Sequence, residues 1–265
     1  MLAKRLTIAD LRALKGRRQL TMLRVETLEE AEAAQHAGID MISVPPSLAQ
    51  DVRFRDVAPS IFVVCSLSYG VYVTVEDYLR GAFAVLRAGA DAVYCSASTK
   101  VISALRQEAI PVCGHAGLIP SQATWTGGLK AVGKTAESAA QVWKQVKVLE
   151  EAGAVMTELE VVPEELATEI ARRTSLFVIS MGSGGGCDAQ YLFAKDVLGS
   201  HDGHYPRHAR VYRDFRAEAE RLQRERIAAF SEYAADVRSG AFPGPSETVR
   251  MDPGELEQFL KTLEE

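Results

Sequence analysis

Apolar residues along the chain follow two spacings, one typical of amphipathic helices and one typical of short buried strands. Three times a helical stretch ends at a glycine, and a short β-rich run with four or five apolar residues follows directly. Glycine ends a helix in the left-handed conformation without steric cost. The apolar run is too short for a helix and fits a strand buried on both faces. The three repeats are AAQHAGIDMISV (33–44), VLRAGADAVYC (85–95) and VLEEAGAVMTELE (148–160).

The same pattern over the whole chain predicts an alternating series of strands and helices. Repeated βα units with nearly continuous apolar strands imply a parallel sheet, and about eight of them favour a closed (β/α)8 TIM barrel of the α/β class. An open doubly wound sheet is the alternative, but no G-x-G-x-x-G follows the first strand to support a dinucleotide site. Thr74 and Thr135 are expected to cap two of the helices. We expect strands near 20–24, 40–44, 61–66, 91–95, 110–114, 155–160, 176–181 and 189–193, and helices near 27–37, 75–88, 99–107, 136–152 and 163–173.

The C-terminal part of the chain has a different pattern. Residues 207–239 form one long charged helical pattern with apolar stripes, GAFPGPSE ends it, and PGELEQFLKTLEE predicts a short acidic helix. We therefore divide the chain into a barrel over 1–205 and a helical extension over 206–265, within one structural domain. The extension is expected to pack on the outside of the barrel or against a partner subunit. Interleaved acids disfavour a basic arm that binds nucleic acid.

The bulk composition is that of an ordinary globular protein of 265 residues, with 47% hydrophobic and 25% charged residues. A net charge of −5 gives no bulk attraction to nucleic acid or to an anionic membrane surface. No apolar run approaches the roughly 20 residues that span a bilayer. The basic N-terminus lacks the uninterrupted apolar region of a secretory signal, so a cytoplasmic protein is expected.

Four cysteines stand at 65, 95, 113 and 187, and no pair has the C-x-x-C spacing of a zinc or redox site. Three of them lie inside apolar runs that are predicted to be strands. We expect small buried side chains in a reducing compartment. A catalytic thiol at Cys113 or Cys187 is the alternative.

Polar residues gather where the predicted strands end, which is where a β/α barrel carries its active site. One stretch stands out, IPVCGHAGLIPSQATWTGGLKAVGK (110–134), because a strand that ends at a histidine and opens into a glycine-containing loop is typical of a small-molecule site. The candidate residues, in chain order, are Arg24, Ser47, Ser66, Tyr94, Ser96, His115, Lys130, Glu158 and Glu160, followed by GSGGGCD at 182–188.

Each candidate has a functional and a structural interpretation. Glu160 is placed to abstract a proton, or to form an ion pair with Arg24 or Lys130. His115 is placed to bind a carboxylate or polarise a carbonyl, or to be a buried histidine with satisfied hydrogen bonds. Arg24 fits bidentate binding of a carboxylate, or a surface salt bridge. The glycines at 182–186 fit a phosphate cradle or, more simply, a tight turn.

Five stretches, in order, resemble the ketopantoate hydroxymethyltransferase family: VCGHAGLIPSQ, GGLKAVGK, ELEVVPEELATEI, ISMGSGGGCDAQYLFAKDVLG and GHYPRHARVYRDF. This family, also called 3-methyl-2-oxobutanoate hydroxymethyltransferase, is related to phosphoenolpyruvate mutase and isocitrate lyase. The resemblance runs from about residue 8 to about residue 245. It implies a metal-dependent β/α barrel in a homo-oligomer, which transfers a hydroxymethyl group from methylenetetrahydrofolate to a branched 2-oxoacid. A divalent metal, usually magnesium, binds the oxoacid in this family and stabilises its enolate.

Laid against the family pattern, the chain departs at the acids that hold the metal. A Gly-Asp-Ser motif belongs after the second strand, where Pro46 replaces the aspartate and Ser47 remains. A second aspartate belongs where Ser66 stands. A Lys-x-Glu pair belongs where Tyr94 and Ser96 stand. Serine hydroxyls and a proline do not replace the carboxylates that magnesium prefers, so we assign no metal site.

Other family positions are retained. His115 corresponds to the histidine after the fifth strand, and Glu160 corresponds to the glutamate assigned as the catalytic base. The segment between the second and third strands is shorter than in the family pattern and is expected to lack its helix. We therefore assign Glu160 and His115 as catalytic. The predicted substrate-binding residues are Arg24, Ser47, Ser66, Tyr94, Ser96 and Lys130.

Three functions remain open at this point. The first is a divergent family member that performs carbon–carbon bond chemistry on a 2-oxoacid or related carboxylate without the metal, and without a confidently assigned cofactor. The second is authentic ketopantoate synthesis with a weak or relocated metal. The third is a non-catalytic barrel that binds a metabolite or a partner. The expected partner of the site is a small-molecule carboxylate; nucleic acid and membrane are not expected.

Overall fold

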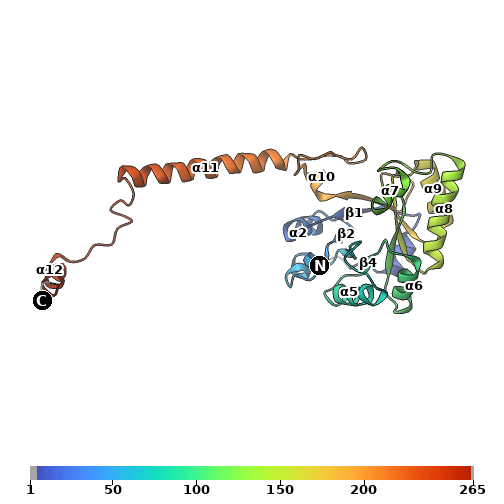
Figure 1. The fold of residues 1–265 in the computed structure, drawn as a ribbon, viewed down its shortest axis with the longest axis horizontal. Coiled ribbons are helices and arrows are strands. Elements are labelled where there is room, and N and C mark those ends of the chain that lie inside the picture. Colours follow the sequence, from blue (N-terminus) through green and yellow to red (C-terminus); the bar gives the residue numbers. More distant parts are fainter. Residues whose placement is uncertain (1–4, 264–265) are drawn as a thin grey trace. The chain divides into compact units, whose positions relative to one another are not determined.

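The chain folds around a closed barrel of eight parallel strands, in which each strand pairs with its neighbours in sequence and β8 pairs with β1 (Figure 1). The computed structural model describes residues 5–263. They divide into two compact units, one up to Arg213 and one from Asp214. The predicted TIM barrel is confirmed, and the open doubly wound sheet is excluded.

Most strands lie within a residue or two of their predicted positions. The fifth strand differs most, because it begins two residues later and continues three residues further than predicted. His115 therefore lies inside this strand, paired with Glu158, while Gly117 pairs with Glu160. The strands are β1 Leu20–Arg24, β2 Met41–Val44, β3 Phe62–Ser66, β4 Ala92–Tyr94, β5 Val112–Gly117, β6 Met156–Glu160, β7 Phe177–Met181 and β8 Ala189–Phe193.

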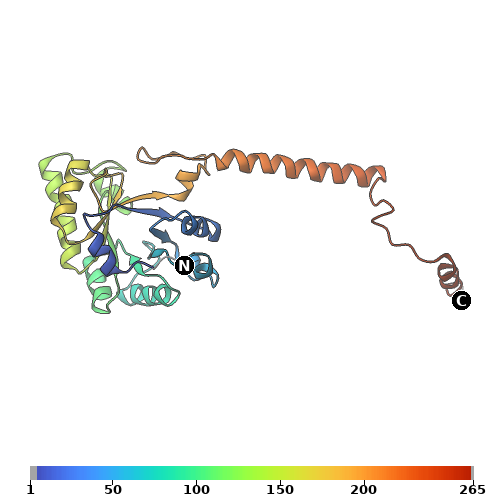
Figure 2. The ribbon, with the colours of Figure 1, turned by 180° about the vertical axis from the view of Figure 1, so that it is seen from behind.

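The predicted outer helices are present, and their ends have the expected caps. The hydroxyls of Thr74 and Thr135 accept hydrogen bonds from the backbone three residues later, which satisfies donors that a helix start leaves free. Helices α8 and α9 lie side by side on the outside of the barrel (Figure 2). The five helices are α2 Leu28–His36, α5 Val75–Arg87, α6 Thr99–Gln107, α8 Ala136–Glu151 and α9 Glu164–Arg173.

The segment between β2 and β3, which was expected to lack the family's helix, contains short helical turns instead of a longer helix. Two one-turn helices, α3 Pro46–Ala49 and α4 Phe54–Val57, connect the strands. Proline at the first position favours the start of α3, because its fixed φ suits a helix and its missing N–H is not needed there. The other short elements that the pattern did not indicate are α1 Ile8–Leu14, η1 Pro120–Gln122, α7 Ala123–Thr126 and α10 Ala194–Leu198.

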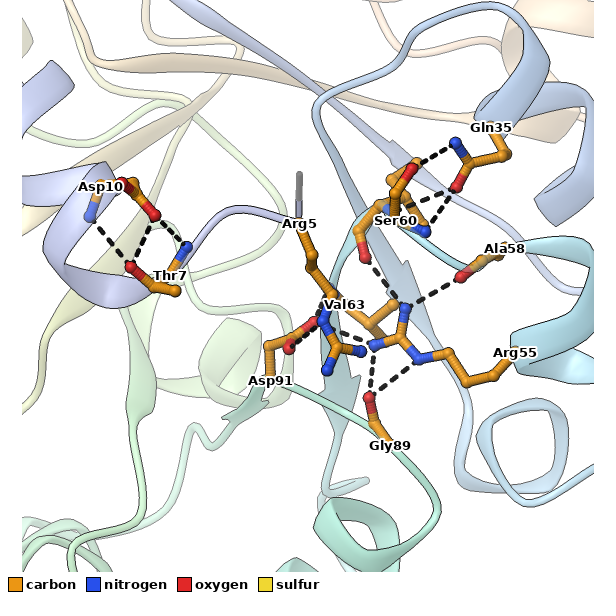
Figure 3. Close-up of polar contacts among 11 residues, drawn as sticks. Arg5, Thr7, Asp10, Gln35, Arg55, Ala58, Ser60, Val63, Gly89 and Asp91 are labelled. Carbon is orange, nitrogen blue, oxygen red and sulfur yellow. Dashed lines mark hydrogen bonds and ion pairs between the residues drawn. The ribbon is translucent and has the colours of Figure 1, made fainter. Parts of the chain in front are cut away.

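Arg55 on α4 ties this short connection to the next βα unit (Figure 3). Its guanidinium donates to the carbonyls of Ala58 and Ile61, both at 3.0 Å, and to Gly89. It also forms an ion pair of 2.9 Å with Asp91, whose carboxylate accepts from the backbone N–H of Val63 on β3. One partly buried guanidinium thus provides hydrogen bonds to carbonyls at the end of this connection and at Gly89.

Side chains along the strands alternate between two apolar cores. Residues such as Ile42 and Val63 point outward, into the layer between the barrel and its helices. Residues such as Met22, Phe62 and Phe177 belong to a second cluster inside the barrel. Because the period of a strand is two, the inward position above Met22 is Arg24, at the carboxyl end of the strand.

Helix α1 closes the amino-terminal end of the barrel. Its Leu11 is 1% exposed and belongs to the inner cluster together with Leu20. Asp188, which precedes β8, holds the end of the helix: its carboxylate accepts from Lys15 Nζ at 2.7 Å and from the backbone N–H of Gly16 at 3.0 Å. The inner core is therefore sealed on the side opposite the strand ends.

The second unit consists of α11 Phe215–Ser239 and α12 Pro253–Lys261. The long helix begins eight residues later than predicted, because the carboxylate of Asp214 caps it by accepting from Ala217 N–H. No residue of α11 is buried. Its predicted packing on the barrel or on a partner subunit stays a prediction, as does the homo-oligomer. None of the helices between residues 5 and 263 is long and apolar enough to cross a membrane.

Candidate active site

A cavity of about 420 Å³ opens at the carboxyl ends of the strands. Each of the eight strands contributes at least one lining side chain, because each has an inward residue at or near its last position. The strand residues that line it are Arg24, Ser43, Ser66, Tyr94, His115, Glu158, Glu160, Met181, Tyr191 and Phe193.

Arg24 places a guanidinium in the wall of this cavity. Its Nη1 donates to Ser66 Oγ at 3.0 Å and to Ser43 Oγ at 3.2 Å, and its Nε donates to Glu26 at 2.7 Å. The side chain is 14% exposed. Within the described chain, Nη2 has no protein acceptor, so one edge of the guanidinium keeps a donor for a ligand.

His115 is buried and hydrogen-bonded through both ring nitrogens. Its Nε2 lies 2.8 Å from the carbonyl of Leu118, which is an acceptor only, so Nε2 carries a proton. Its Nδ1 lies 2.7 Å from the hydroxyl of Tyr94. Burial lowers the pKa of His115, but the hydrogen bond to Glu160 and the charges of Glu158 and Glu160 outweigh it and raise the pKa above its ordinary value.

Two glutamates on β6 flank this histidine. Glu160 Oε2 lies 3.2 Å from Nε2, and Glu158 Oε2 lies 3.6 Å from Nδ1. Burial raises the pKa of Glu158 to about 7; His115 and Arg24 oppose the rise, and Glu160 adds to it. The ion pair that we considered between Glu160 and Arg24 or Lys130 is not formed, since Arg24 pairs with Glu26.

The backbone around Glu160 is tightly constrained. Gly117 on the neighbouring strand has a φ of +84°, and a Cβ there would lie 2.5 Å from the Glu160 carbonyl. Val161 has a φ of +49°, a conformation that is strained for a β-branched residue. Its N–H donates to the Met181 carbonyl at 2.8 Å and its carbonyl accepts from Val132. Strain of this kind concentrates at functional sites.

The predicted site residues divide into those that meet in the cavity and those that do not. Ser47 is exposed at the start of α3 and does not line the cavity; Ser43, four residues earlier, is the residue from β2 that does. Lys130 lines an adjoining cavity of about 460 Å³ that shares Glu160 and His208 with the first. The predicted residues that share the first cavity are Arg24, Ser66, Tyr94, Ser96, His115 and Glu160.

The sequence prediction missed several lining residues. Glu158 stands at a strand end but received no role, and Ser43 and Tyr191 were not considered. The alternation of a strand was a sufficient signal, because Glu158 lies two residues before Glu160 and must share its inward face. His208 had no such signal: it reaches the cavity from the loop after α10, over the bare backbone of Gly182, where a Cβ would lie 2.7 Å from the ring.

The glycine run after β7 forms a turn held by protein contacts. The backbone N–H of Ser183 donates to Ser180 Oγ at 3.1 Å, and that of Gly185 donates to Glu164 at 3.0 Å. These amides are not free to cradle a phosphate, so the tight-turn interpretation is favoured.

All four cysteines are buried and free, as expected. Burial raises the pKa of Cys113 well above its ordinary value and that of Cys187 to about 12. Because the thiolate is the nucleophile, these shifts disfavour the alternative of a catalytic thiol.

The family model for ketopantoate hydroxymethyltransferase matches residues 52–245, which include most of this site. The chain belongs to the ketopantoate hydroxymethyltransferase family. A 3-methyl-2-oxobutanoate hydroxymethyltransferase from Thermus thermophilus is 36% identical over 263 residues, covering 91% of this chain and 98% of the relative. The protein of the same name from Nitratidesulfovibrio vulgaris is 32% identical, covering 98% of this chain and 90% of its own length.

Solved structures support the fold of this family member. A phosphonomutase-like protein from Burkholderia cenocepacia aligns with a TM-score of 0.52 at 14% identity, covering 66% of this chain and 83% of its own. A 2,3-dimethylmalate lyase of the PEP mutase/isocitrate lyase superfamily aligns with a TM-score of 0.50 at 14% identity, covering 97% and 95%. At such identities the likeness concerns the barrel alone.

Proposed function

We propose that this family member carries out carbon–carbon bond chemistry on a 2-oxoacid, with Arg24 in the role that a divalent metal has by family resemblance. One observation supports this most directly. The guanidinium of Arg24 donates to Ser66 Oγ, the position at which the resemblance places a metal-binding aspartate. The positive charge of Arg24 therefore lies beside the position where the family pattern has a negatively charged aspartate.

The donor set around this point does not fit magnesium. The resemblance places metal-binding acids at Pro46, Ser66 and Ser96, none of which carries a carboxylate. Between residues 5 and 263, no group of three or more His, Cys, Asp or Glu side chains is arranged to hold a metal ion. Neutral hydroxyls do not offset the free energy lost when a divalent cation is dehydrated, and the positive charge of Arg24 repels such a cation.

The proposed reaction begins with removal of a proton from the carbon beside the 2-oxo group. The substrate carboxylate binds the free Nη2 edge of Arg24, which places the oxo group near the floor of the cavity. The Glu160 carboxylate takes the proton, and the electron pair of the C–H bond becomes an enolate. His115 holds Glu160 in place through the contact at Nε2. The enolate carbon then bonds to an electrophilic carbon, or the reverse sequence breaks such a bond.

Deuterium exchange tests the first step without knowledge of the second substrate. The protein is incubated with 3-methyl-2-oxobutanoate in D2O and excess chelator, and loss of the methine proton is followed by NMR. Exchange is expected for the wild type and for the control Glu165→Gln, an exposed position on α9. Glu160→Gln is expected to lose it. No exchange in the wild type, with or without magnesium, contradicts the proposal.

Authentic ketopantoate synthesis is the second candidate, favoured by the shared name of the relatives. It predicts exchange that disappears with the chelator and returns with magnesium, and formation of ketopantoate when methylenetetrahydrofolate is added. The adjoining cavity, lined by Lys130, Lys134 and Arg207, is a suitable place for an anionic co-substrate in either case.

A further inference from the structure

Glu158 has no role in the chemistry described above, yet its position is unusual. The residue is 4% exposed, and its carboxyl lines the floor of the active-site cavity. Within residues 5–263 no group donates a hydrogen bond to this carboxyl, and its nearest charged atom is His115 Nδ1 at 3.6 Å. Burying an ionised carboxylate without hydrogen-bond donors costs free energy. A protonated carboxyl group that faces a ligand site costs much less, because it carries no charge.

The charges around Glu158 come from several strands. Arg24 on β1 and His115 on β5 favour its ionised form, whereas Glu160 on β6 disfavours it. Tyr94 on β4, Cys113 on β5 and Tyr191 on β8 also face it, and their own ionisation is opposed by its charge. On β7 the paired residue is Ile179, which is apolar.

Positive charge in this cluster is too small to neutralise both glutamates. Arg24 is already paired with Glu26 at 2.7 Å. His115 is shared between the two acids, and its shorter contact is to Glu160. When nearby positive charge cannot neutralise two carboxyl groups, the more deeply buried group keeps its proton. Glu158, which is 4% exposed, is therefore the acid.

We propose that Glu158 is a neutral carboxylic acid that donates a hydrogen bond to the oxo oxygen of the bound 2-oxoacid and stabilises the enolate with Arg24. The inference rests on the proposed function. The proton that leaves carbon goes to Glu160, and the proton of Glu158 stays on its own carboxyl, so no further reactant is needed. An acid kept neutral by its surroundings is an effective donor to a developing oxyanion, because no charge is added beside it.

Two substitutions separate donation from charge and packing. Glu158→Gln keeps a neutral donor of the same shape, and Glu158→Met keeps the volume without a donor. At about pH 6 the methionine variant is expected to exchange about 100-fold more slowly than the wild type, the cost of removing one oxyanion donor. The glutamine variant should stay within about tenfold of the wild type, and Glu165→Gln serves as the control. Equal rates for the methionine variant and the wild type overturn the proposal.

The pH profile gives a signature that a structural role does not produce. Wild-type exchange is expected to fall about tenfold per pH unit above about pH 7, as Glu158 ionises. The glutamine variant should lack this fall, while any fall caused by His115 persists in both proteins. A descending limb that is identical in the wild type and Glu158→Gln assigns the titration elsewhere and overturns the inference.

Binding of oxalate, a dianion shaped like the enolate, provides a readout that does not need turnover. Calorimetry at about pH 8 in two buffers of different ionisation heat measures proton uptake. The wild type is expected to take up close to one proton with oxalate, and Glu158→Gln to take up much less. Binding without uptake in the wild type contradicts the inference alone. No oxalate binding and no exchange at any pH contradict the proposed function, and the inference with it.

Discussion

Replacing Glu158 with glutamine is expected to stabilise the folded protein at alkaline pH. The carboxyl group of Glu158 has an ordinary pKa of 4.5, and burial raises this pKa to about 7 in the folded state. Between these two values the folded chain holds a proton that the unfolded chain has released, so stability falls as pH rises through this window. The full difference corresponds to about 3 kcal/mol, which the folded state has lost by about pH 8.

Urea denaturation followed by circular dichroism, at about pH 5 and about pH 8.5, measures this difference. The free energy of unfolding of the wild type should decrease between the two values by about 3 kcal/mol more than that of Glu158→Gln. The raised pKa of His115 gives a slope of the same sign in both proteins and largely cancels in the comparison. Glu32→Gln, at an exposed position on α2, should keep the wild-type slope. If Glu158→Gln keeps it too, Glu158 is ionised in the folded protein and the reasoning is wrong.

Three further substitutions test the framework around the site. Gly117→Ala should lower stability by about 2 kcal/mol or more, measured by urea denaturation, because its Cβ meets the Glu160 carbonyl at a positive φ; unchanged stability contradicts the close approach. Arg55→Met should cost about 3 kcal/mol in the same assay, since three carbonyls lose their donor and the Asp91 carboxylate keeps only Arg5 and the Val63 N–H as partners within residues 5–263; a loss below about 1 kcal/mol contradicts this. Arg24→Lys should raise the KM for deuterium exchange about tenfold or more, because an ammonium cannot hold two serines, Glu26 and a ligand together; an unchanged KM excludes Arg24 from binding.

Much of the barrel could be predicted from the sequence because local signals and tertiary packing agree. Glycine after a helix, threonine before one and uninterrupted apolar runs marked the helices and strands of the βα units nearly to the residue. Arg24 and Glu160 were found by the same logic, since each stands at the last position of a strand whose end was well defined.

The parts that were missed depend on contacts between distant segments. The rule of alternation was not applied to the second strand, so Ser47 was predicted from the motif comparison and Ser43 was not considered. His208 reaches the cavity only because Gly182 leaves room for its ring. The role of Arg55 depends on carbonyls that lie up to 34 residues away. No local pattern specifies such contacts.

The closure of the barrel by α1 affects how ligands enter and leave the site. With Leu11 filling the amino-terminal end and Asp188 anchoring the helix, the cavity of the described barrel opens at the carboxyl ends of the strands. A molecule on the floor, beside Arg24 and Glu158, therefore lies beneath any second molecule that occupies the mouth. We expect a ligand on the floor to enter first and leave last, so that a two-substrate reaction in this barrel should show an ordered sequence of binding and release in its steady-state kinetics.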